Sequence, residues 1–276
     1  MTEYISDREQ IISLWIEAFG DRRENVELFL DTLFKEQNYF SVKRNGQILS
    51  QTFLVPVKLS GRREAFDGYY FCCAATRKDR RGEGLMASLL NQVKETVIER
   101  GKDFVALIPA SNSLFNFYSK FGFESFFCCN EALVKSQRNG ENIIFSPVQD
   151  VSELLDIQQE YASKNPGLIV KSREIFNYLA EDARLSGYKI YAASNSFGKI
   201  GYIFFDPEKS LIREALINDN EQEVLAAFGS EMGLDSITVR QKGKEPCRPK
   251  GMIFAANKKV KELEKYFPFI NNLLES

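Results

Sequence analysis

The sequence contains no histidine among its 276 residues. A Ser-His-Asp or Cys-His nucleophile system is therefore excluded, and so is a metal site built on histidine. Any acid–base chemistry must use tyrosine, carboxylates, cysteine, lysine, a chain terminus or the substrate itself.

Cysteine is also scarce, with five residues, of which four stand in the adjacent pairs Cys72-Cys73 and Cys128-Cys129. Such spacing fits neither a disulfide framework nor a set of metal ligands, and we predict no metal site. Because free cysteine is among the most buried residue types, the pattern predicts buried, reduced thiols in strands.

Long hydrophobic runs are missing as well, since no apolar stretch approaches the roughly 20 residues of a membrane-spanning helix. The first ten residues, MTEYISDREQ, are charged and lack the apolar segment of a signal peptide. A formal net charge of −2 provides no broad basic surface for nucleic acid. These features predict a cytoplasmic protein that binds neither membrane nor nucleic acid, and they leave its oligomeric state open.

What the sequence does have is the composition of a globular protein, with 44% hydrophobic and 27% charged residues. Ser6 and Glu9 form a capping box that predicts the start of a first helix. Asn45-Gly46 predicts a hairpin, so the sheet should begin antiparallel. The apolar strand 66–75, a helix from about residue 85 to Gly101 and the strand that follows then form a crossover, which predicts two parallel neighbouring strands.

A second unit begins near residue 143 and repeats this order of elements only in outline. The predicted elements are helices near 150–163, 173–184 and 221–232, strands in YKIYAAS, KIGYIFF, LIREALI, DSITVR and GMIFAAN, and a terminal helical segment. The mixture of helices and strands predicts the α/β class with mixed (α+β) sheets. We divide the chain into two domains, residues 1–140 and 141–276.

The strongest candidate for chemistry is DRRGEGLMASLL, residues 79–90, where glycines and basic residues meet the start of a helix. A helix N-terminus leaves backbone N–H groups unpaired and carries the positive end of the helix dipole, so it attracts anions. Gly82 and Gly84 let an anion approach without interference from Cβ atoms. The turn predicts a pyrophosphate site, and the alternative is a glycine turn with a solvated basic face. The basic residues of this cluster are Arg77, Lys78, Arg80 and Arg81.

Two other phosphate-binding loops can be tested on the same residues. A P-loop needs a lysine directly after its last glycine, and none follows Gly84. The dinucleotide fingerprint fits as Gly82-x-Gly84-x-x-Ala87, but the preceding strands look antiparallel and the acidic Asp103 falls at the start of the next strand. An NAD-type oxidoreductase is therefore the weaker alternative.

The turn resembles the acetyl-CoA-binding motif of the GNAT superfamily of N-acetyltransferases, Gln/Arg-x-x-Gly-x-Gly/Ala, with Arg81 first, Gly84 in the middle and Met86 last. PASNSLFNFYSKFGFE resembles the downstream motif of the same superfamily. The likeness covers residues 1 to about 135, and a Leu-Met pair after RRGxG is similar to the enhanced-intracellular-survival branch with its tandem GNAT-like domains. The resemblance implies a GNAT-like N-terminal domain followed by a second, degenerate GNAT-like domain without a cofactor.

By this resemblance the protein is an acetyl-CoA-dependent N-acetyltransferase that passes the acetyl group directly to an amine of a small molecule or peptide. Tyr118 would be the general acid for the departing CoA thiolate, and the alternative is that its ring only packs on Phe121 and Phe123. The implied cofactor-binding residues are Cys73, Ala74 and Ala75 in the strand, Arg80, Arg81, Gly82, Glu83, Gly84, Leu85 and Met86 in the turn, and Asn112 beside the CoA arm.

Several assignments stay open at this point. The general base is not readable, although three carboxylates lie on segments near the expected cleft: Glu64, Asp67 and Glu124. In the enhanced-intracellular-survival proteins the C-terminal carboxylate reaches the active site, which makes Ser276 a further candidate. A covalent role for Cys72 or Cys73 lacks a histidine that would lower the thiol pKa. A non-catalytic acyl-CoA-binding or interaction module is the main alternative function.

Overall fold

The computed structural model describes residues 2–138, 143–242 and 247–270. Its first half contains α1 (Thr2–Phe19), α2 (Arg23–Thr32), η1 (Glu36–Asn38), β1 (Tyr39–Arg44), β2 (Gln47–Ser60), β3 (Ala65–Thr76), η2 (Lys78–Arg80), α3 (Leu85–Glu99), β4 (Phe104–Leu107), α4 (Asn112–Ser119) and β5 (Glu124–Lys135). Its second half contains β6 (Ile144–Pro147), α5 (Ser152–Lys164), β7 (Ile169–Val170), α6 (Arg173–Ser186), β8 (Lys189–Asn195), β9 (Gly198–Asp206), β10 (Leu211–Ile217), α7 (Glu221–Glu231), β11 (Ser236–Lys242), β12 (Pro249–Ala255) and η3 (Lys258–Tyr266).

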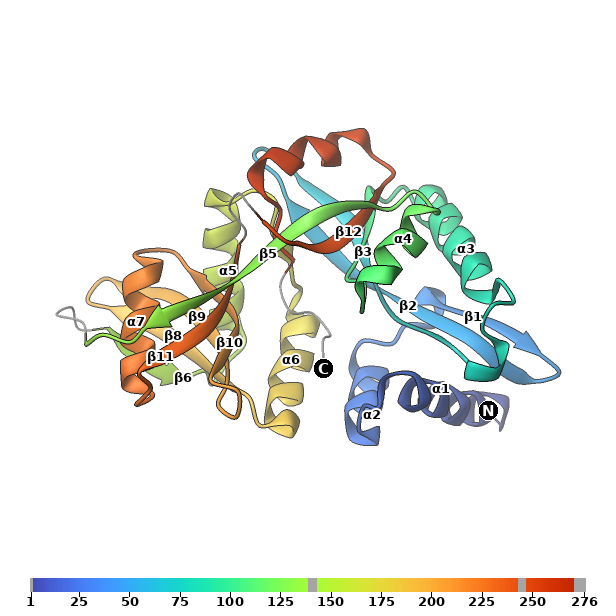
Figure 1. Ribbon diagram of the computed structural model, residues 1–276, viewed down its shortest axis with the longest axis horizontal. Coiled ribbons are helices and arrows are strands. Elements are labelled where there is room, and N and C mark those ends of the chain that lie inside the picture. The colour runs from blue at the N-terminus through green and yellow to red at the C-terminus, as the bar shows by residue number, and fades with distance from the viewer. Residues whose placement is uncertain (1, 139–142, 243–246, 271–276) are drawn as a thin grey trace.

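The described strands form one continuous mixed sheet in the order β1-β2-β3-β4-β12-β5-β11-β10-β9-β8-β6, with β7 paired to β2. Figure 1 shows this sheet bent into an arch, with α1, α2 and α6 below it. The mixed α/β class that the sequence predicts is confirmed.

The local elements of the first half agree with the sequence in all but one detail. Asn45 and Gly46 both have positive φ angles, 51° and 74°, as a two-residue hairpin turn requires, and they join β1 to β2. The strands β3 and β4 are parallel and are linked through α3, which confirms the predicted crossover. The capping box was wrong: α1 already begins at Thr2, so Ser6 lies inside the helix because the preceding residues are helical too.

The second half repeats the strand order of the first. Its strands β8, β9 and β10 form an antiparallel meander, and α7 then links β10 to the parallel strand β11. The same hairpin-then-crossover order in both halves is the arrangement expected of two GNAT-like units in tandem.

Two strands from beyond the proposed division between residues 140 and 141 pair with strands of the first half. The strand β12 lies between β4 and β5 and pairs antiparallel with both, so a segment from the end of the chain completes the sheet of the first half. The short strand β7 also pairs with β2. The division into residues 1–140 and 141–276 stays a prediction about sequence units, since the two halves exchange strands.

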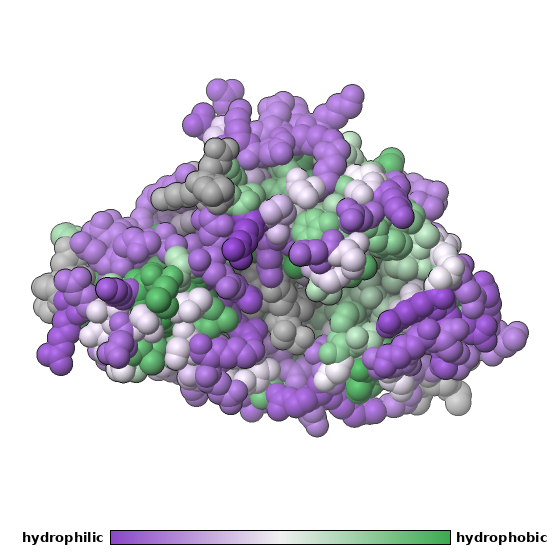
Figure 2. Space-filling model, in the orientation of Figure 1, coloured by the Kyte–Doolittle hydropathy of each residue, from purple (hydrophilic) through white to green (hydrophobic). Residues whose placement is uncertain are grey.

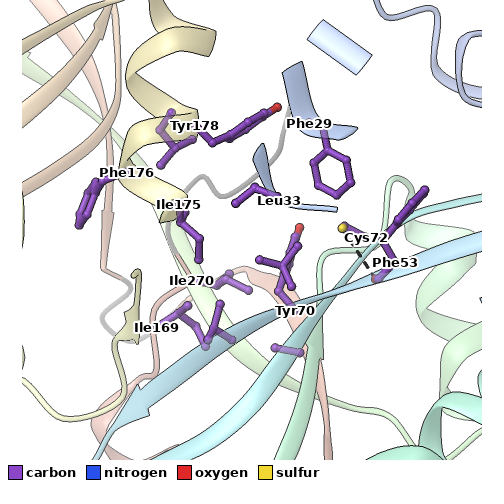
Figure 3. Packing of buried hydrophobic residues seen from close by; sticks show 14 of the residues in the cluster. Phe29, Leu33, Phe53, Tyr70, Cys72, Ile169, Ile175, Phe176, Tyr178 and Ile270 are labelled. Atoms are coloured by element: carbon purple, nitrogen blue, oxygen red, sulfur yellow. Dashed lines mark hydrogen bonds between the residues drawn. The ribbon is translucent and has the colours of Figure 1, made fainter. Parts of the chain in front are cut away.

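The largest hydrophobic cluster lies where the two halves meet. It joins side chains of α1, α2, β2 and β3 to side chains of α5, β7 and α6. The rings of Phe29 in α2 and Tyr178 in α6 are nearly perpendicular, with centroids 6.1 Å apart. Figure 3 shows the centre of this cluster, with Phe29, Leu33, Phe53, Tyr70, Cys72, Ile169, Ile175, Phe176, Tyr178 and Ile270 labelled. The halves therefore share a core instead of merely touching.

The prediction that the cysteines are all reduced was wrong for one pair. Cys128 of β5 and Cys247, just before β12, form a disulfide with their Cα atoms 5.8 Å apart. They are brought together because β12 returns to pair with β5, and a separation of 119 residues left no local signal for this bond. Cys72, Cys73 and Cys129 are free, and Cys72 is buried as predicted.

A fully buried ion pair anchors the start of α6. The Nζ atom of Lys171 donates to both carboxylate oxygens of Glu214 in β10, at 2.6 and 2.7 Å, and the hydroxyl of Tyr202 donates to one of them at 2.6 Å. The side chains of Lys171 and Glu214 are 0% and 1% exposed. Because buried charges are costly unless they are paired, this pair fixes the chain directly before α6.

Candidate active site

The two central strands of the first half separate at one end. They pair only at Gly68–Tyr70 of β3 and Phe104–Ala106 of β4, and β4 ends one residue later. The strand β3 continues to Thr76 while remaining paired with β2 on its other side. Within the described ranges, residues 71–76 of β3 therefore have no strand partner on the β4 side, and their backbone groups there can pair with an extended ligand.

A β-bulge lies in this open stretch, where Cys73 has a φ angle of 53°. Between the pairs Phe53–Cys72 and Gln51–Ala75 the register shifts by one residue. Cys73 packs toward α1 and α2, whereas Ala74 packs toward α3 and α4. A bulge bends the strand and re-aims its backbone groups, so the predicted residues Cys73, Ala74 and Ala75 form the irregular part of the open edge.

Two buried polar residues that the sequence reasoning missed support this bulge. Thr52 donates its hydroxyl to the carbonyl of Cys72 at 3.0 Å, and Ser50 donates to the carbonyl of Ala75 at 3.1 Å. Both side chains are fully buried. The signal was present in the sequence, because Ser50, Gln51 and Thr52 interrupt an otherwise apolar strand.

The open edge leads to the glycine turn. Gly82 and Gly84 have φ angles of 88° and 77°, and Gly84 is the N-cap of α3. The first intrahelical bond runs from the Ser88 N–H to the Gly84 carbonyl, so the amides before Ser88 point out of the helix end. A Cβ atom built on either glycine would meet no heavy atom within 4 Å, so the space in front of these amides is open. Leu85 is buried and Met86 packs against the core beneath α3.

The basic cluster around the turn is partly neutralised. Asp79 pairs with Arg77 at 3.2 Å and with Arg80 at 3.7 Å. The carboxylate of Glu83 pairs with Arg80 at 3.5 Å and with Arg44, which the sequence reasoning did not single out, at 3.0 Å. The Nε of Arg81 donates to the Thr76 carbonyl at 3.3 Å, which ties the turn to the end of β3. All these side chains are exposed enough to re-orient toward an anion.

Tyr118 lies near the end of α4 and is 7% exposed. Its ring meets Phe71 of β3 edge-on with centroids 6.1 Å apart, and it shares a core cluster with Ala74. Burial raises the pKa of the Tyr118 hydroxyl to about 12, so the group holds its proton at neutral pH. Tyr118 also packs edge-on against Phe117 and Phe123, which shows that it has a packing role whatever its chemistry.

The remaining predicted residues are on the surface or undescribed. Asn112 is the exposed first residue of α4. The three carboxylates considered as bases are exposed and form surface ion pairs: Glu64 with Lys259, Asp67 with Lys58 and Glu124 with Lys261. Ser276 lies outside the described residues.

The thiol of Cys73 at the bulge is poorly suited to act as a nucleophile. Burial raises the pKa of Cys73 well above its ordinary value, and Asp21 and Cys72 act in the same direction. A thiol with a raised pKa is protonated and unreactive at neutral pH.

The geometry also argues against a dinucleotide site of the Rossmann type. The strand before the turn, β3, is paired antiparallel with β2. Asp103 precedes β4 and accepts hydrogen bonds from the Asp67 amide at 2.8 Å and from Asn257 at 2.8 Å. Since β3 and β4 are parallel, Asp103 lies at the end of the sheet opposite to the turn and is out of reach of a ligand there.

Comparisons with known proteins show what the chain resembles. Residues 4–126 match the family model described as the acetyltransferase (GNAT) domain. The N-terminal half of the chain is therefore similar to the acetyltransferase (GNAT) domain. Among curated proteins, none matches the chain.

Solved structures resemble the chain over both of its halves. A protein of Enterococcus faecalis V583 described as a probable N-acyltransferase has a TM-score of 0.75 at 18% identity, covering 92% of this chain and 72% of that one. A GCN5-related N-acetyltransferase from Anabaena variabilis has a TM-score of 0.74 at 14% identity, covering 90% and 70%. Eis1 from Mycobacterium abscessus has a TM-score of 0.69 at 11% identity, covering 91% and 71%. At such identities the likeness shows the fold, and that fold includes the second, degenerate unit.

The hydropathy of the surface is uneven around the site. Figure 2 shows hydrophobic side chains over the region of α3 and α4, while the rim of the molecule is largely hydrophilic. None of the helices in the described ranges is both long and apolar enough to span a membrane.

Proposed function

We propose that the protein is an acetyl-CoA-dependent N-acetyltransferase. The observation that carries this proposal is the open edge of β3, which runs from the separation of the strands at Tyr70 to the glycine turn at the N-terminus of α3. An extended pantetheine arm can pair with that edge, and the exposed amides and basic residues of the turn suit a pyrophosphate.

In the proposed reaction a neutral amine attacks the thioester carbonyl, so that a C–N bond forms and the C–S bond breaks. The amine nitrogen loses a proton to water or a base, and the CoA thiolate gains one. The Tyr118 hydroxyl donates its proton, or a strong hydrogen bond, to the thiolate, and solvent restores it. With a pKa of about 12, the Tyr118 hydroxyl is protonated at neutral pH and is available as a proton donor.

Acetyl-CoA, CoA and NAD, added one at a time, test this proposal. Stabilisation against heat by acetyl-CoA and CoA but not by NAD supports it, and release of free thiol with an amine present shows turnover. Stabilisation by acetyl-CoA without turnover on any amine would favour the non-catalytic acyl-CoA-binding module. Stabilisation by NAD alone would favour the oxidoreductase.

Replacement of Gly84 by valine is expected to weaken CoA binding at least tenfold, about 1.4 kcal/mol. The branched side chain would stand in the open space before the amides, and valine also strains at a φ angle of 77°. Calorimetry measures the affinity. Gly101→Val is the matched control, since Gly101 has a φ angle of 61° and equally open space but lies at the other end of α3. Equal loss of affinity in both variants would show that the glycine turn does not bind the pyrophosphate.

CoA affinity is expected to fall with added salt, because the screening length is only about 10 Å at 0.1 M. The slope should become shallower in the variant Arg77→Gln/Lys78→Gln/Arg80→Gln. The control Lys258→Gln/Lys259→Gln/Lys261→Gln removes the same charge from exposed positions in η3. Identical slopes in the wild type and the turn variant would mean that the cluster only solubilises the protein.

We expect one CoA molecule per chain. The corresponding turn of the second half, between β10 and α7, has Asn220 as N-cap and carries acidic Glu221 and Glu223 in the first helical turn. Two carboxylates in the first turn of a helix repel a phosphate at that N-terminus. A calorimetric stoichiometry of two would show that the second half binds a cofactor as well.

A further inference from the structure

The second half repeats the strand separation that marks the candidate site of the first half. Within the described ranges, β10 and β11 pair in parallel only over residues 211–212 and 238–239, although β10 continues to Ile217 and β11 to Lys242. The pairing of β10 with β9 also shifts by one residue at Arg213, as the pairing of β3 does at its bulge. These strands lie in the left part of Figure 1. The second half therefore has diverging strands of its own, which the CoA proposal leaves unused.

A cavity of about 960 Å³ lies at the end of the sheet where β10 and β11 diverge. It is lined by residues 240–242 at the end of β11 and by Glu221 and Gln222 at the start of α7. Residues from β5, from the start of β12 and from the ends of α5 and η3 complete its wall. A volume of this order is typical of small-molecule sites, so the cavity has room for an organic molecule and not only for an ion.

A buried donor without an acceptor belongs to the wall of this cavity. Gln241 lines the cavity, and its Nε2 atom is buried with no hydrogen-bond partner in the part of the chain that the structure describes. The backbone of Gln241 is fixed, because β11 pairs with β5 on its other side. A buried amide group normally has a partner, so this one marks a place where a ligand can supply an oxygen acceptor.

Cationic side chains outnumber carboxylates around the cavity. Arg240 pairs with Glu131 at 3.2 Å, whereas Lys242 and Arg248 form no ion pair within the described ranges. Burial lowers the pKa of Lys242, as expected for an ammonium without a close carboxylate. These donors favour an anionic ligand. The charged lining residues are Arg240, Lys242, Arg248 and Lys250 on one side of the balance and Glu131 and Glu221 on the other.

The acidic start of α7 restricts the kind of anion that fits. Glu221 and Glu223 lie in the first turn of this helix, so a phosphate group would be repelled there. The anion should therefore bind on the β11 side of the cavity, at Lys242 and Arg248. A carboxylate has a single negative charge and two oxygens in one plane, which match the planar donors of Arg248 and Gln241.

Aromatic side chains also line the cavity. Tyr161 comes from α5, and Tyr266 and Phe267 come from the end of η3. Burial raises the pKa of Tyr161 to about 12, and the charge of Glu221 acts in the same direction, so the hydroxyl of this ring stays neutral at neutral pH. Aromatic surfaces close to an anion site suit a ligand whose anionic group is attached to a planar ring.

We propose that this cavity of the second half binds an aromatic carboxylate, with the carboxylate on Lys242, Arg248 and the Nε2 of Gln241 and the ring against Tyr161 and Tyr266. The cavity shares no lining residue with the open edge of β3 or with the glycine turn. It is therefore a second site, independent of the proposed acetyl transfer, and the second half is a ligand-binding unit of its own.

Calorimetry on the full chain with three probes tests this site. The probes are 2-naphthoate, its uncharged amide 2-naphthamide and 2-naphthyl phosphate, which share one ring system and differ in the group attached to it. We expect 2-naphthoate to bind at least tenfold more tightly than either of the others. Its affinity should be the same with and without CoA, because the two sites share no residue.

Variants of the lining residues locate the bound probe. Lys242→Met should weaken 2-naphthoate binding at least tenfold, and Arg248→Gln, at an exposed position where folding is not at risk, at least threefold. Gln241→Met should weaken binding several-fold without lowering the thermal stability of the free protein, because the deleted donor has no partner there. Lys189→Met is the matched control, since Lys189 is an exposed strand lysine of the second half that does not line the cavity.

The possible results decide between the site and its alternatives. No binding of 2-naphthoate, or equal affinity for 2-naphthoate and 2-naphthamide, would overturn the proposal. So would an affinity that stays unchanged in Lys242→Met and Arg248→Gln. Tighter binding of 2-naphthyl phosphate that the same variants abolish would show a phosphate site instead. Displacement of 2-naphthoate by CoA would place the probe in the first half and would also overturn the proposal.

Discussion

Replacement of Tyr118 by phenylalanine is expected to lower the rate of acetyl transfer by about 10²–10⁴-fold, the usual span for a positioned acid. The substitution keeps the ring that packs against Phe71 and Phe123 and deletes only the hydroxyl. Folding and acetyl-CoA affinity should therefore be unchanged. The rate of thiol release with an active amine, compared at saturating substrate, measures the effect.

Tyr69→Phe is the matched control for this experiment. Tyr69 belongs to the same core cluster as Tyr118, is similarly buried, and its hydroxyl accepts from Arg100 at 3.3 Å. Loss of that hydroxyl should leave the transfer rate within a few-fold of the wild type. Because burial raises the pKa of Tyr118 to about 12, the wild-type rate should also show no loss from ionisation of this group up to about pH 10. A Tyr118→Phe variant with the wild-type rate would show that Tyr118 only packs in the core. An ordered water would then be the candidate for the acid.

Replacement of Lys171 by methionine is expected to destabilise the protein by about 3–5 kcal/mol, because the Glu214 carboxylate would remain buried without its cation. Chemical denaturation measures the loss. The double variant Lys171→Met/Glu214→Gln buries no charge and should recover most of the stability.

An exposed ion pair provides the comparison for that result. Lys164 and Glu160 pair at 2.7 Å on the surface of α5, with side chains 55% and 49% exposed. Lys164→Met should cost at most about 0.5 kcal/mol, as is usual for exposed helical pairs. If Lys171→Met costs no more than Lys164→Met, the buried pair does not anchor the start of α6.

The parts of the structure that the sequence predicted are those that depend on neighbouring residues. The hairpin at Asn45-Gly46, the crossover through α3 and the glycine turn each carry their signal within a short stretch of chain. The exception is the start of α1, where a local capping pattern was present but the helix extends past it. Ser50 and Thr52 also carried a readable signal, as polar residues in an apolar strand.

What the sequence could not predict depends on contacts between distant segments. Nothing near Cys247 indicates that it meets Cys128, because that contact follows from the position of β12. Likewise, Asp182 and Tyr178 read as ordinary residues of an amphipathic helix, and only the packing of α6 on α2 brings them to Asn25 and Phe29. A contact between residues more than 150 positions apart leaves no pattern in a single sequence.

The position of β12 sets the order in which the first half can be finished during synthesis. The strand β5 ends at Lys135 and β12 begins at Pro249, so at roughly 5–20 residues per second several seconds separate their emergence from the ribosome. During that interval the facing edges of β4 and β5 lack the strand that lies between them, and unpaired edges invite pairing with other chains. The sheet of the first half is therefore complete only after β12 has been synthesised. A chain released before residue 249 would contain the glycine turn, but the edges of β4 and β5 would stay unpaired and prone to aggregation.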